Sequence, residues 1–283
     1  MKIVASDELI RDVFDKTRDE LIDVIDRHTV NVQAWLASRS PQAATFQGKG
    51  IRASSTGFKL PLLNLALGWN FSPDIGEAEI EDEIEAVKAF FAARHVPWYW
   101  WTRPSSEQRK KIMQRHGLEH EVHPFPAMLA TLEPGRYSLP GFPGKIHVWA
   151  AHTLDDLKAA SKIRRTAFNF PNVEALTYFE DMASDWLQNK NVALFLAGER
   201  ETEPVSMGAL IHEAGIPGVY AMATLPEHHR KGYGKAILTR LMTEATSNGH
   251  SHIALTASHA GYGLYSQFGF HYIYDVEAYT LSR

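Results

Sequence analysis

Apolar positions in the second half of the chain follow two spacings, which predict a series of strands and helices. Runs typical of strands lie at 145–151, 192–199, 203–214, 218–225, 252–257 and 270–281. Apolar residues at helical spacing lie at 153–170, 172–189, 235–245 and 258–269. The predicted order is β-α-α-β-β-β-α-β-α-β, which indicates a mixed α/β fold.

The first half begins with a long helical pattern and then alternates strand and helix. Apolar residues recur at helical spacing over 6–38, and Ser6 is the expected N-cap. After a polar break at 38–50, the predicted elements are a strand at 58–71, a helix at 76–95, a strand at 96–102, a helix at 105–117 and a strand region at 118–132. Pro61 predicts an edge strand or a bend, because proline cannot donate a ladder hydrogen bond.

A segment rich in proline and glycine separates the two halves. Residues 133–145, "EPGRYSLPGFPGK", have the composition of a linker. We therefore predict an N-terminal region at 1–140 and a second domain at 145–283, both of ordinary domain size.

Composition narrows the classes of function. Of 283 residues, 45% are hydrophobic and 22% charged, with a net charge of −4, so we expect no general nucleic-acid binding. The absence of cysteine excludes disulfides, thiolate metal sites and a covalent cysteine intermediate. No apolar run of membrane-spanning length and no signal-peptide core is present. We expect a cytoplasmic protein that binds no membrane and no metal.

The stretch "HHRKGYGKA" (228–236) joins a predicted strand to a predicted helix. Gly232 and Gly234 allow backbone N–H groups to approach an anion closely, and a helix N-terminus adds partial positive charge. Arg230 and Lys231 suit a diphosphate. The stretch therefore predicts a pyrophosphate-binding loop.

Two other phosphate motifs fit the stretch poorly. A P-loop requires glycine where His229 stands and Ser or Thr where Ala236 stands. A dinucleotide fingerprint requires a third glycine at Ile237 and an acidic residue about twenty positions later, which "HIALTAS" does not supply.

Two motifs in this half resemble those of the GNAT superfamily of N-acetyltransferases. "LPEHHRKGYGKAIL" (225–238) resembles the family's coenzyme A loop, in which Arg or Gln is followed by two residues, Gly, any residue, and Gly or Ala. "LYSQFGF" (264–270) resembles its second motif, one helix and one strand later. One departure is His229, where the family usually has Arg or Gln; a neutral imidazole can still donate one N–H to a phosphate.

The resemblance implies a GNAT acyl-CoA N-acyltransferase fold, a mixed and mostly antiparallel sheet flanked by helices. It implies that strand 218–225 bulges and splays from the next strand, and that acetyl-CoA is the cosubstrate, with no metal. The residues it implies in coenzyme binding are Met222, Ala223, Thr224, His229, Arg230, Lys231, Gly232, Tyr233, Gly234 and Lys235, with Ser258 as a helix N-cap that also contacts the coenzyme arm. Tyr265 is implied as the general acid for the leaving thiolate.

The first half looks like a degenerate copy of the second half of a GNAT domain. Its strands and helices over 58–132 follow the same order, but the loop "NFSPDIGEAEI" (70–80) lacks Gly-x-Gly and is acidic. We predict a tandem arrangement in which the N-terminal half binds no coenzyme. An unrelated α/β domain is the alternative.

Several assignments stay open at this level. His212 and Glu213 are candidates for the base that deprotonates the amine, and a water chain would serve as well. "WYWW" (98–101) fits a core strand better than a pocket wall, and His250 and His252 are expected at the surface. The leading function is acetyl transfer to a primary amine, of a small molecule or a peptide. A non-catalytic acyl-CoA-binding or interaction protein is the alternative, and a homodimer is possible.

Overall fold

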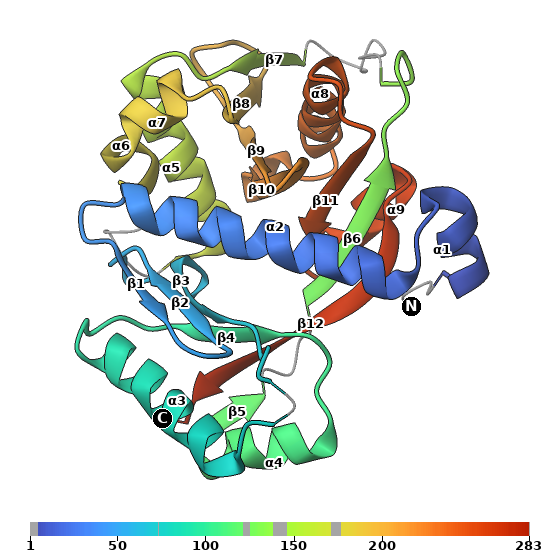
Figure 1. Cartoon of the computed structure of the whole chain (residues 1–283). Helices are drawn as coiled ribbons and strands as arrows, with labels where there is room; N and C mark the ends of the chain where they lie inside the picture. Colours follow the sequence, from blue (N-terminus) through green and yellow to red (C-terminus); the bar gives the residue numbers. More distant parts are fainter. Residues whose placement is uncertain (1–4, 73, 121–124, 138–145, 171–176, 283) are drawn as a thin grey trace.

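The computed structural model describes residues 5–72, 74–120, 125–137, 146–170 and 177–282 (Figure 1). Its strands are β1 (Ala44–Gln47), β2 (Arg52–Ser55), β3 (Asn64–Leu67), β4 (Tyr99–Thr102), β5 (Leu118–His120), β6 (Phe125–Thr131), β7 (His147–Ala150), β8 (Val192–Gly198), β9 (Ser206–Glu213), β10 (Ile216–Thr224), β11 (His252–Thr256) and β12 (His271–Leu281). Its α-helices are α1 (Asp7–Phe14), α2 (Arg18–Arg39), α3 (Glu77–Ala92), α4 (Glu107–Arg115), α5 (Leu154–Phe168), α6 (Tyr178–Asp181), α7 (Ala183–Gln188), α8 (Tyr233–Ser247) and α9 (Tyr262–Gln267).

The strands form one mixed sheet in the order β1-β2-β3-β4-β12-β6-β11-β10-β9-β8-β7, with β5 beside β12. Two neighbouring pairs, β3 with β4 and β10 with β11, are parallel, and the other pairs are antiparallel. The expected class, a mostly antiparallel mixed sheet flanked by helices, is confirmed.

The two halves of the chain exchange strands. β6, from the first half, lies between β11 and β12, with Ala130 opposite Ile253 and Leu129 opposite His271. The end of β12 in turn lies between β4 and β5, with Ala278 opposite Trp101. Figure 1 shows β12 running from the upper part of the molecule into the lower part. The regions predicted at 1–140 and 145–283 therefore share one continuous sheet.

The first half repeats the local topology of the second. In each half a parallel pair of strands is joined through a helix, β3–α3–β4 in the first and β10–α8–β11 in the second. Each half also receives the inserted strand of the other next to that parallel pair. This repeat gives the N-terminal half the arrangement expected of a GNAT-like copy.

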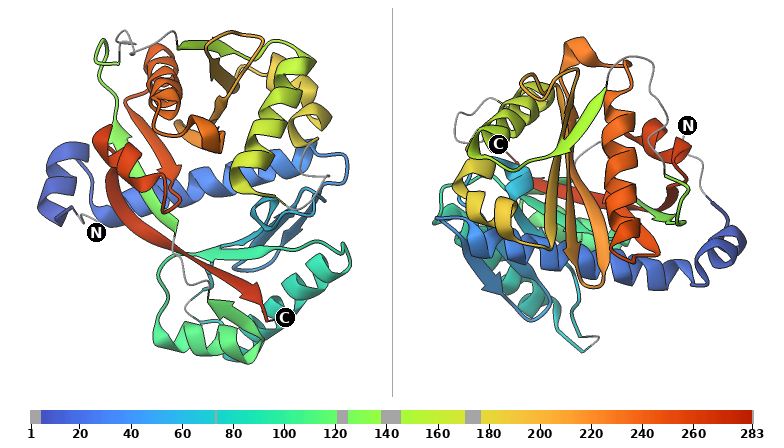
Figure 2. Two further views of the ribbon diagram at one scale, coloured as in Figure 1. Left: turned by 180° about the vertical axis from the view of Figure 1, so that it is seen from behind. Right: turned by 90° about the horizontal axis from the view of Figure 1, so that it is seen from above.

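Helices cover both faces of the sheet in the second half. Alternate residues of β8 point to opposite faces, so Leu194 and Leu196 pack in the core under α5, α6 and α7, whereas Phe195 packs in the core under α8 and α9. Figure 2, right, shows the strands between yellow-green α5 and orange α8. The long helix α2 contacts strands of both halves, β1, β2, β9 and β12.

The elements predicted for the second half are confirmed with small changes at their ends. The helix expected at 172–189 is present as α6 and α7, and residues 171–176 lie outside the described part. The helix expected at 258–269 is shorter and begins at Tyr262. Of the expected linker at 133–145, only residues 133–137 are described.

The first half required more correction. The pattern at 6–38 is two helices, because Asp15 has a φ of 51° after α1 and Thr17 starts α2 with a capping box. Ser6 caps α1 as predicted. The predicted strand at 58–71 was wrong over most of its length, since Pro61 begins a 3₁₀ turn and only β3 is a strand. The short strands β1 and β2 were both missed.

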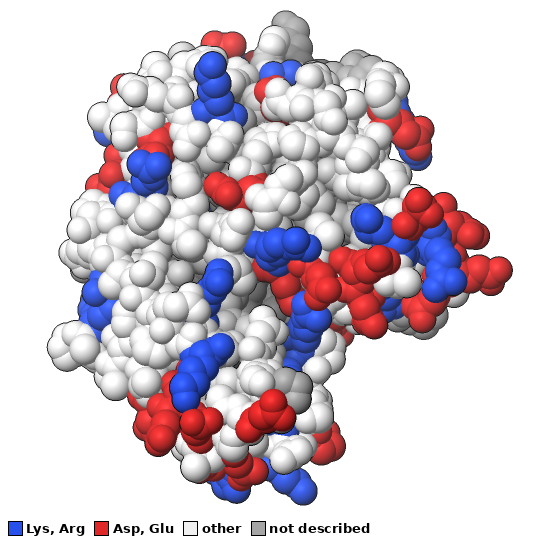
Figure 3. All heavy atoms as spheres, in the orientation of Figure 1, with Lys and Arg blue, Asp and Glu red and all other residues white. Residues whose placement is uncertain are grey.

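The first half of α3 is rich in acidic residues, and not all of them face solvent. Arg115 forms ion pairs with Glu77 and Glu81, and acidic side chains gather over this lower region in Figure 3. Glu83, by contrast, is buried and accepts hydrogen bonds from the backbone N–H groups of Lys49 and Gly50. None of the helices in the described ranges is both long and apolar enough to cross a membrane.

Candidate active site

The parallel strands β10 and β11 diverge near their carboxyl ends. They pair only at Gly218 with Ala254 and at Val219 with Leu255. A bulge against β9 follows between Tyr220 and Ala223. This is the bulged and splayed strand that the family resemblance implied, and it opens a gap in the middle of the sheet.

The loop before α8 has the form of an anion-binding site. Gly232 is the N-cap of α8 with a φ of 94°, a conformation that favours glycine, and no side chain caps the helix. The backbone N–H groups of 230–235 donate to no acceptor among the described residues. Arg230, Lys231 and Lys235 are exposed beside them. Free N–H groups and positive charge at a helix N-terminus fit a diphosphate.

The side chain of His229 takes a different role from the one expected. Its Nε2 lies 2.9 Å from the carbonyl oxygen of Thr224, so a proton on Nε2 is donated to that carbonyl. A neutral His229 then has only an acceptor nitrogen left for other contacts. Contact with a phosphate therefore falls to the backbone N–H groups, Arg230 and Lys231.

The end of β10 is held in place by a buried hydroxyl. Ser206, on β9, donates to the carbonyl oxygen of Ala223 at 2.9 Å and lies 2.8 Å from Oγ1 of Thr224. Met222 lines the pocket beside the gap. The strand end expected to hold the coenzyme arm is thus bonded to β9 through this side chain.

Tyr265 and Ser258 lie on the other side of the gap. Tyr265, on α9, packs its ring against Phe270 at 5.8 Å, and burial raises the pKa of its hydroxyl to about 12. Ser258 does not cap α9 as predicted: Gly261 is the N-cap, and Oγ of Ser258 accepts from the N–H of Gly261 in the preceding turn. Both residues line the pocket that also contains Met222.

A cavity of about 200 Å³ extends from this gap toward α2 and α5. Its wall is rich in aromatic rings, which come from Trp101, Phe125, Phe168, Phe170, Tyr178, Phe179, Trp186, Tyr220 and Tyr265. We call it the central pocket. No His, Asp or Glu of the described residues lines it.

Two polar residues of the central pocket were missed in the sequence. Arg164, on α5, is 9% exposed, and the rings of Tyr178 and Phe179 surround its guanidinium at 5.0 and 5.6 Å. Burial lowers the pKa of Arg164. Gln33, on α2, is 6% exposed. In sequence both occupy ordinary helical positions, and nothing local marks them as pocket residues.

The candidate bases lie elsewhere. His212 and Glu213 end β9 at the hairpin opposite Pro217 and Ile216, on the far side of the bulge, and neither lines the central pocket. Nδ1 of His212 lies 2.9 Å from Nε2 of His250. Burial, and next the neighbouring His250, lowers the pKa of His212 to about 4. The structure does not bring these residues to the site.

The "WYWW" stretch divides between core and pocket. Trp98 and Trp100 are buried in the core under α3, as predicted. Trp101 points to the other face and lines the central pocket and a second one.

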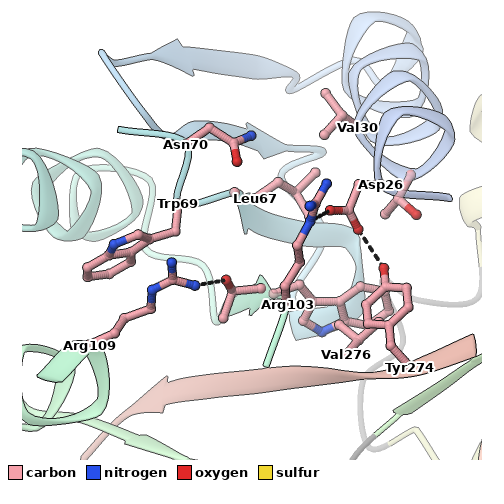
Figure 4. Close-up of a pocket in the computed structure, with 13 residues that line it drawn as sticks. Asp26, Val30, Leu67, Trp69, Asn70, Arg103, Arg109, Tyr274 and Val276 are labelled. Atoms are coloured by element: carbon pink, nitrogen blue, oxygen red, sulfur yellow. Dashed lines mark hydrogen bonds and ion pairs between the residues drawn. The ribbon is translucent and has the colours of Figure 1, made fainter. Parts of the chain in front are cut away.

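The second pocket, of about 190 Å³, lies at the matching position in the first half, where β3 and β4 end (Figure 4). Arg109 stacks over Trp69 at 4.9 Å and donates to Thr102, and Arg103 pairs with Asp26. Helix α3, which follows β3, has Glu77 and Glu79 in its first turn. Carboxylates there repel a diphosphate, in contrast to the loop before α8.

Comparison with known proteins agrees with this geometry. Residues 158–270 match the family model of the acetyltransferase (GNAT) family. No curated protein sequence matches the chain.

Among solved structures, the chain is similar to GCN5-related N-acetyltransferases from Kribbella flavida (17% identity, TM-score 0.66, 89% of this chain and 93% of that one) and Sphaerobacter thermophilus (16%, 0.64, 91% of each). It is also similar to a tandem GNAT protein from the clavulanic acid biosynthesis pathway (11%, 0.61, 95% of each). At such identities these structures establish the fold. Residues 158–270 are therefore a domain of the acetyltransferase (GNAT) family, within a chain that has the GNAT fold along most of its length.

Proposed function

We propose that the protein is an acetyl-CoA-dependent N-acetyltransferase that moves the acetyl group to a primary amine by direct attack on the thioester. The observation that carries the proposal is the position of the splayed strand β10 between the loop at 230–235 and the central pocket. The coenzyme would lie against the loop and the acceptor would enter the pocket.

The residues present fit the coenzyme. The N–H groups of 230–235 would donate to its diphosphate, and Arg230 and Lys231 would offset the negative charge. The end of β10, over 222–224, would hold the pantetheine arm and donate a backbone N–H to the acetyl carbonyl as negative charge develops there.

Tyr265 would assist departure of the sulfur. A phenol with a pKa of about 12 stays protonated at every working pH and can donate a hydrogen bond. Full proton transfer to a thiolate with a reference pKa of about 8.5 is uphill by about 5 kcal/mol. We therefore assign Tyr265 as a hydrogen-bond donor to the sulfur, while the proton lost by the attacking nitrogen completes the thiol.

None of the described residues is assigned as a side-chain base for the amine. Of the described residues, the titratable ones that line the central pocket are Arg164 and three tyrosines, none of which accepts a proton from an ammonium group at neutral pH. The amine would therefore enter neutral or lose its proton to water.

Thiol release from acetyl-CoA against a panel of primary amines tests the proposal. Turnover that depends on an amine, with the acetylated product found by mass spectrometry, supports it. Calorimetric binding of acetyl-CoA with no turnover on any amine would favour the alternative, a non-catalytic acyl-CoA-binding protein.

A second experiment tests the assignment of the two halves. The acidic start of α3 predicts that the first half binds no coenzyme, so titration should give one acetyl-CoA per chain. Two coenzymes per chain would contradict this assignment.

A further inference from the structure

We infer that the acceptor amine carries a carboxylate next to an apolar or aromatic body, as an amino acid does, and that Arg164 binds this carboxylate. The inference rests on the proposed function, because it names the acceptor of the same site. It starts from polar groups that line the central pocket and have no partner in the part of the chain that the structure describes.

Arg164 is a buried cation without a counterion in the described part of the chain. None of the described carboxylates lies within ion-pair distance of it, and its Nε donates to no acceptor. A buried charge is costly unless it is paired and hydrogen-bonded. The faces of Phe170, Tyr178 and Phe179 attract the positive charge but leave the in-plane N–H groups of the guanidinium without acceptors.

Other unpartnered polar atoms line the same pocket. Among the described residues, the indole N–H groups of Trp101 and Trp186 are buried donors without acceptors, and Oε1 of Gln33 is a buried acceptor without a donor. Buried polar atoms of this kind ordinarily have partners. Three donor groups and one acceptor in an aromatic wall fit a ligand that has an anionic group, an N–H group and an apolar body.

The position of Arg164 indicates that the anionic group it binds belongs to the acceptor and not to the coenzyme. Arg164 is on α5, which packs on the face of the sheet that carries Leu194 and Ile211. The loop at 230–235 leads into α8, which packs on the opposite face. A diphosphate bound at this loop would therefore lie on the opposite face of the sheet from Arg164, and the central pocket extends from Arg164 to the gap beside β10.

The chemistry of the guanidinium favours a carboxylate. Its planar fork matches a carboxylate with two parallel hydrogen bonds. An acceptor amine that has no anionic group would leave Arg164 buried and unpaired. The wall of Phe168, Phe170 and Trp186 then suits the side chain of an apolar or aromatic amino acid.

The test compares L-phenylalanine and L-leucine with their amides, which keep the amine and side chain and lose the carboxylate charge. In the unmodified protein we expect the acids to be acetylated with the lower KM. In Arg164→Gln the KM of the acids should rise about tenfold to a hundredfold, as expected when charge-assisted hydrogen bonds are lost. The KM of the amides should change little. The ratio of acid to amide, compared between the two proteins, cancels the different basicity of the two amines.

Lys162→Gln is the matched control. Lys162 is exposed on the same helix, carries the same charge and does not line the pocket, so the acid-to-amide ratio should stay unchanged. Arg164→Lys keeps the charge and loses the fork; it should give an intermediate ratio, and it provides the test if Arg164→Gln does not fold.

Two further arms separate the possible failures. In the first, succinyl-CoA replaces acetyl-CoA. A preference for succinyl-CoA that disappears in Arg164→Gln would mean that Arg164 binds the carboxylate of the acyl group, and would overturn the inference. Calorimetry of L-phenylalanine and its amide without any coenzyme measures the carboxylate preference even if no turnover occurs.

The outcomes are distinct. Turnover of amines with equal use of acids and amides would leave the proposed function standing and reject the inference. Preferential binding of the acids without any turnover, lost in Arg164→Gln, would support the carboxylate site and reject the enzyme.

Discussion

The hydroxyl of Tyr274, on β12, donates a hydrogen bond to Asp26, on α2, although 248 positions separate the two residues. Arg103, which follows β4, also donates to Asp26, so this carboxylate joins three elements. They meet where β12 passes from the second half of the sheet into the first, and Figure 4 shows the three side chains together. The contact therefore ties the helix shared by both halves to the exchanged strand.

Tyr274→Phe should destabilise the protein by about 1–3 kcal/mol, because it removes one hydrogen bond to a charged group and leaves the ring in place. Chemical unfolding measures the change. In a double-mutant cycle with Asp26→Ala, which removes the acceptor, the two effects should not add, since both variants remove the same bond. Additive effects would mean that the contact does not contribute to stability.

Gly234→Val should lower the affinity for acetyl-CoA at least about tenfold with little effect on folding. A Cβ at Gly234 would lie 3.6 Å from Oγ1 of Thr224 and 3.7 Å from Leu264, which is ordinary contact, so a methyl group fits. A branched side chain would extend further, into the space between the loop and the gap. Calorimetry gives the affinity and a melting curve the stability, with Gly234→Ala as control. Unchanged affinity in Gly234→Val would remove this loop from the coenzyme site.

Tyr265→Phe should lower kcat about tenfold to a hundredfold while coenzyme affinity stays the same. The variant deletes only the hydroxyl, and a hydrogen bond to a developing thiolate contributes about 1.5–3 kcal/mol. Because the pKa of Tyr265 is about 12, its titration should give no inflection in the rate profile below about pH 10. Normal turnover in Tyr265→Phe, together with a lowered melting temperature in Tyr265→Ala, would leave Tyr265 with a packing role only.

His212→Gln should make the protein less sensitive to mild acid. The folded-state pKa of His212, about 4, is below the unfolded value near 6.5, so the unfolded state binds more protons between these values. Stability from the neutral imidazole is present above about pH 6.5 and is lost as the pH falls toward 4. The full shift corresponds to a loss of about 2 kcal/mol of unfolding free energy between pH 7 and pH 5. Because His212 is only half-buried, solvent screens part of this effect, and we expect a loss of about 1 kcal/mol.

Unfolding free energies at pH 7 and pH 5, for the unmodified protein and His212→Gln, measure this difference. Acetyl transfer by the variant should be unaffected, because His212 lies at the hairpin and not at the pocket. A loss of turnover with unchanged stability would restore His212 as the candidate base.

The sequence alone determined the elements of the second half and the glycine-containing loop at 230–235. Alternating and helical spacings are local properties, and they predicted β8, β9, β10, α8 and β11 close to their observed bounds. Gly232, with a φ of 94°, provides the backbone conformation needed at the strand-to-helix junction, and this requirement is also local. The failures at Pro61 and at β1 lie where the pattern was short or polar, so that packing and not periodicity decided the structure.

Only the tertiary structure decided which strands are neighbours and which side chains line the pocket. The period of a strand indicates the face that each residue occupies, but the pairing of β6 with β11, and of the end of β12 with β4, depends on contacts between distant segments. Arg164 and Gln33 have ordinary helical surroundings in sequence, and they become buried polar groups because α2 and α5 close over the same gap in the sheet. His212 directly follows Ile211, which lines the central pocket, but successive side chains of a strand point to opposite faces of the sheet, so His212 does not line it.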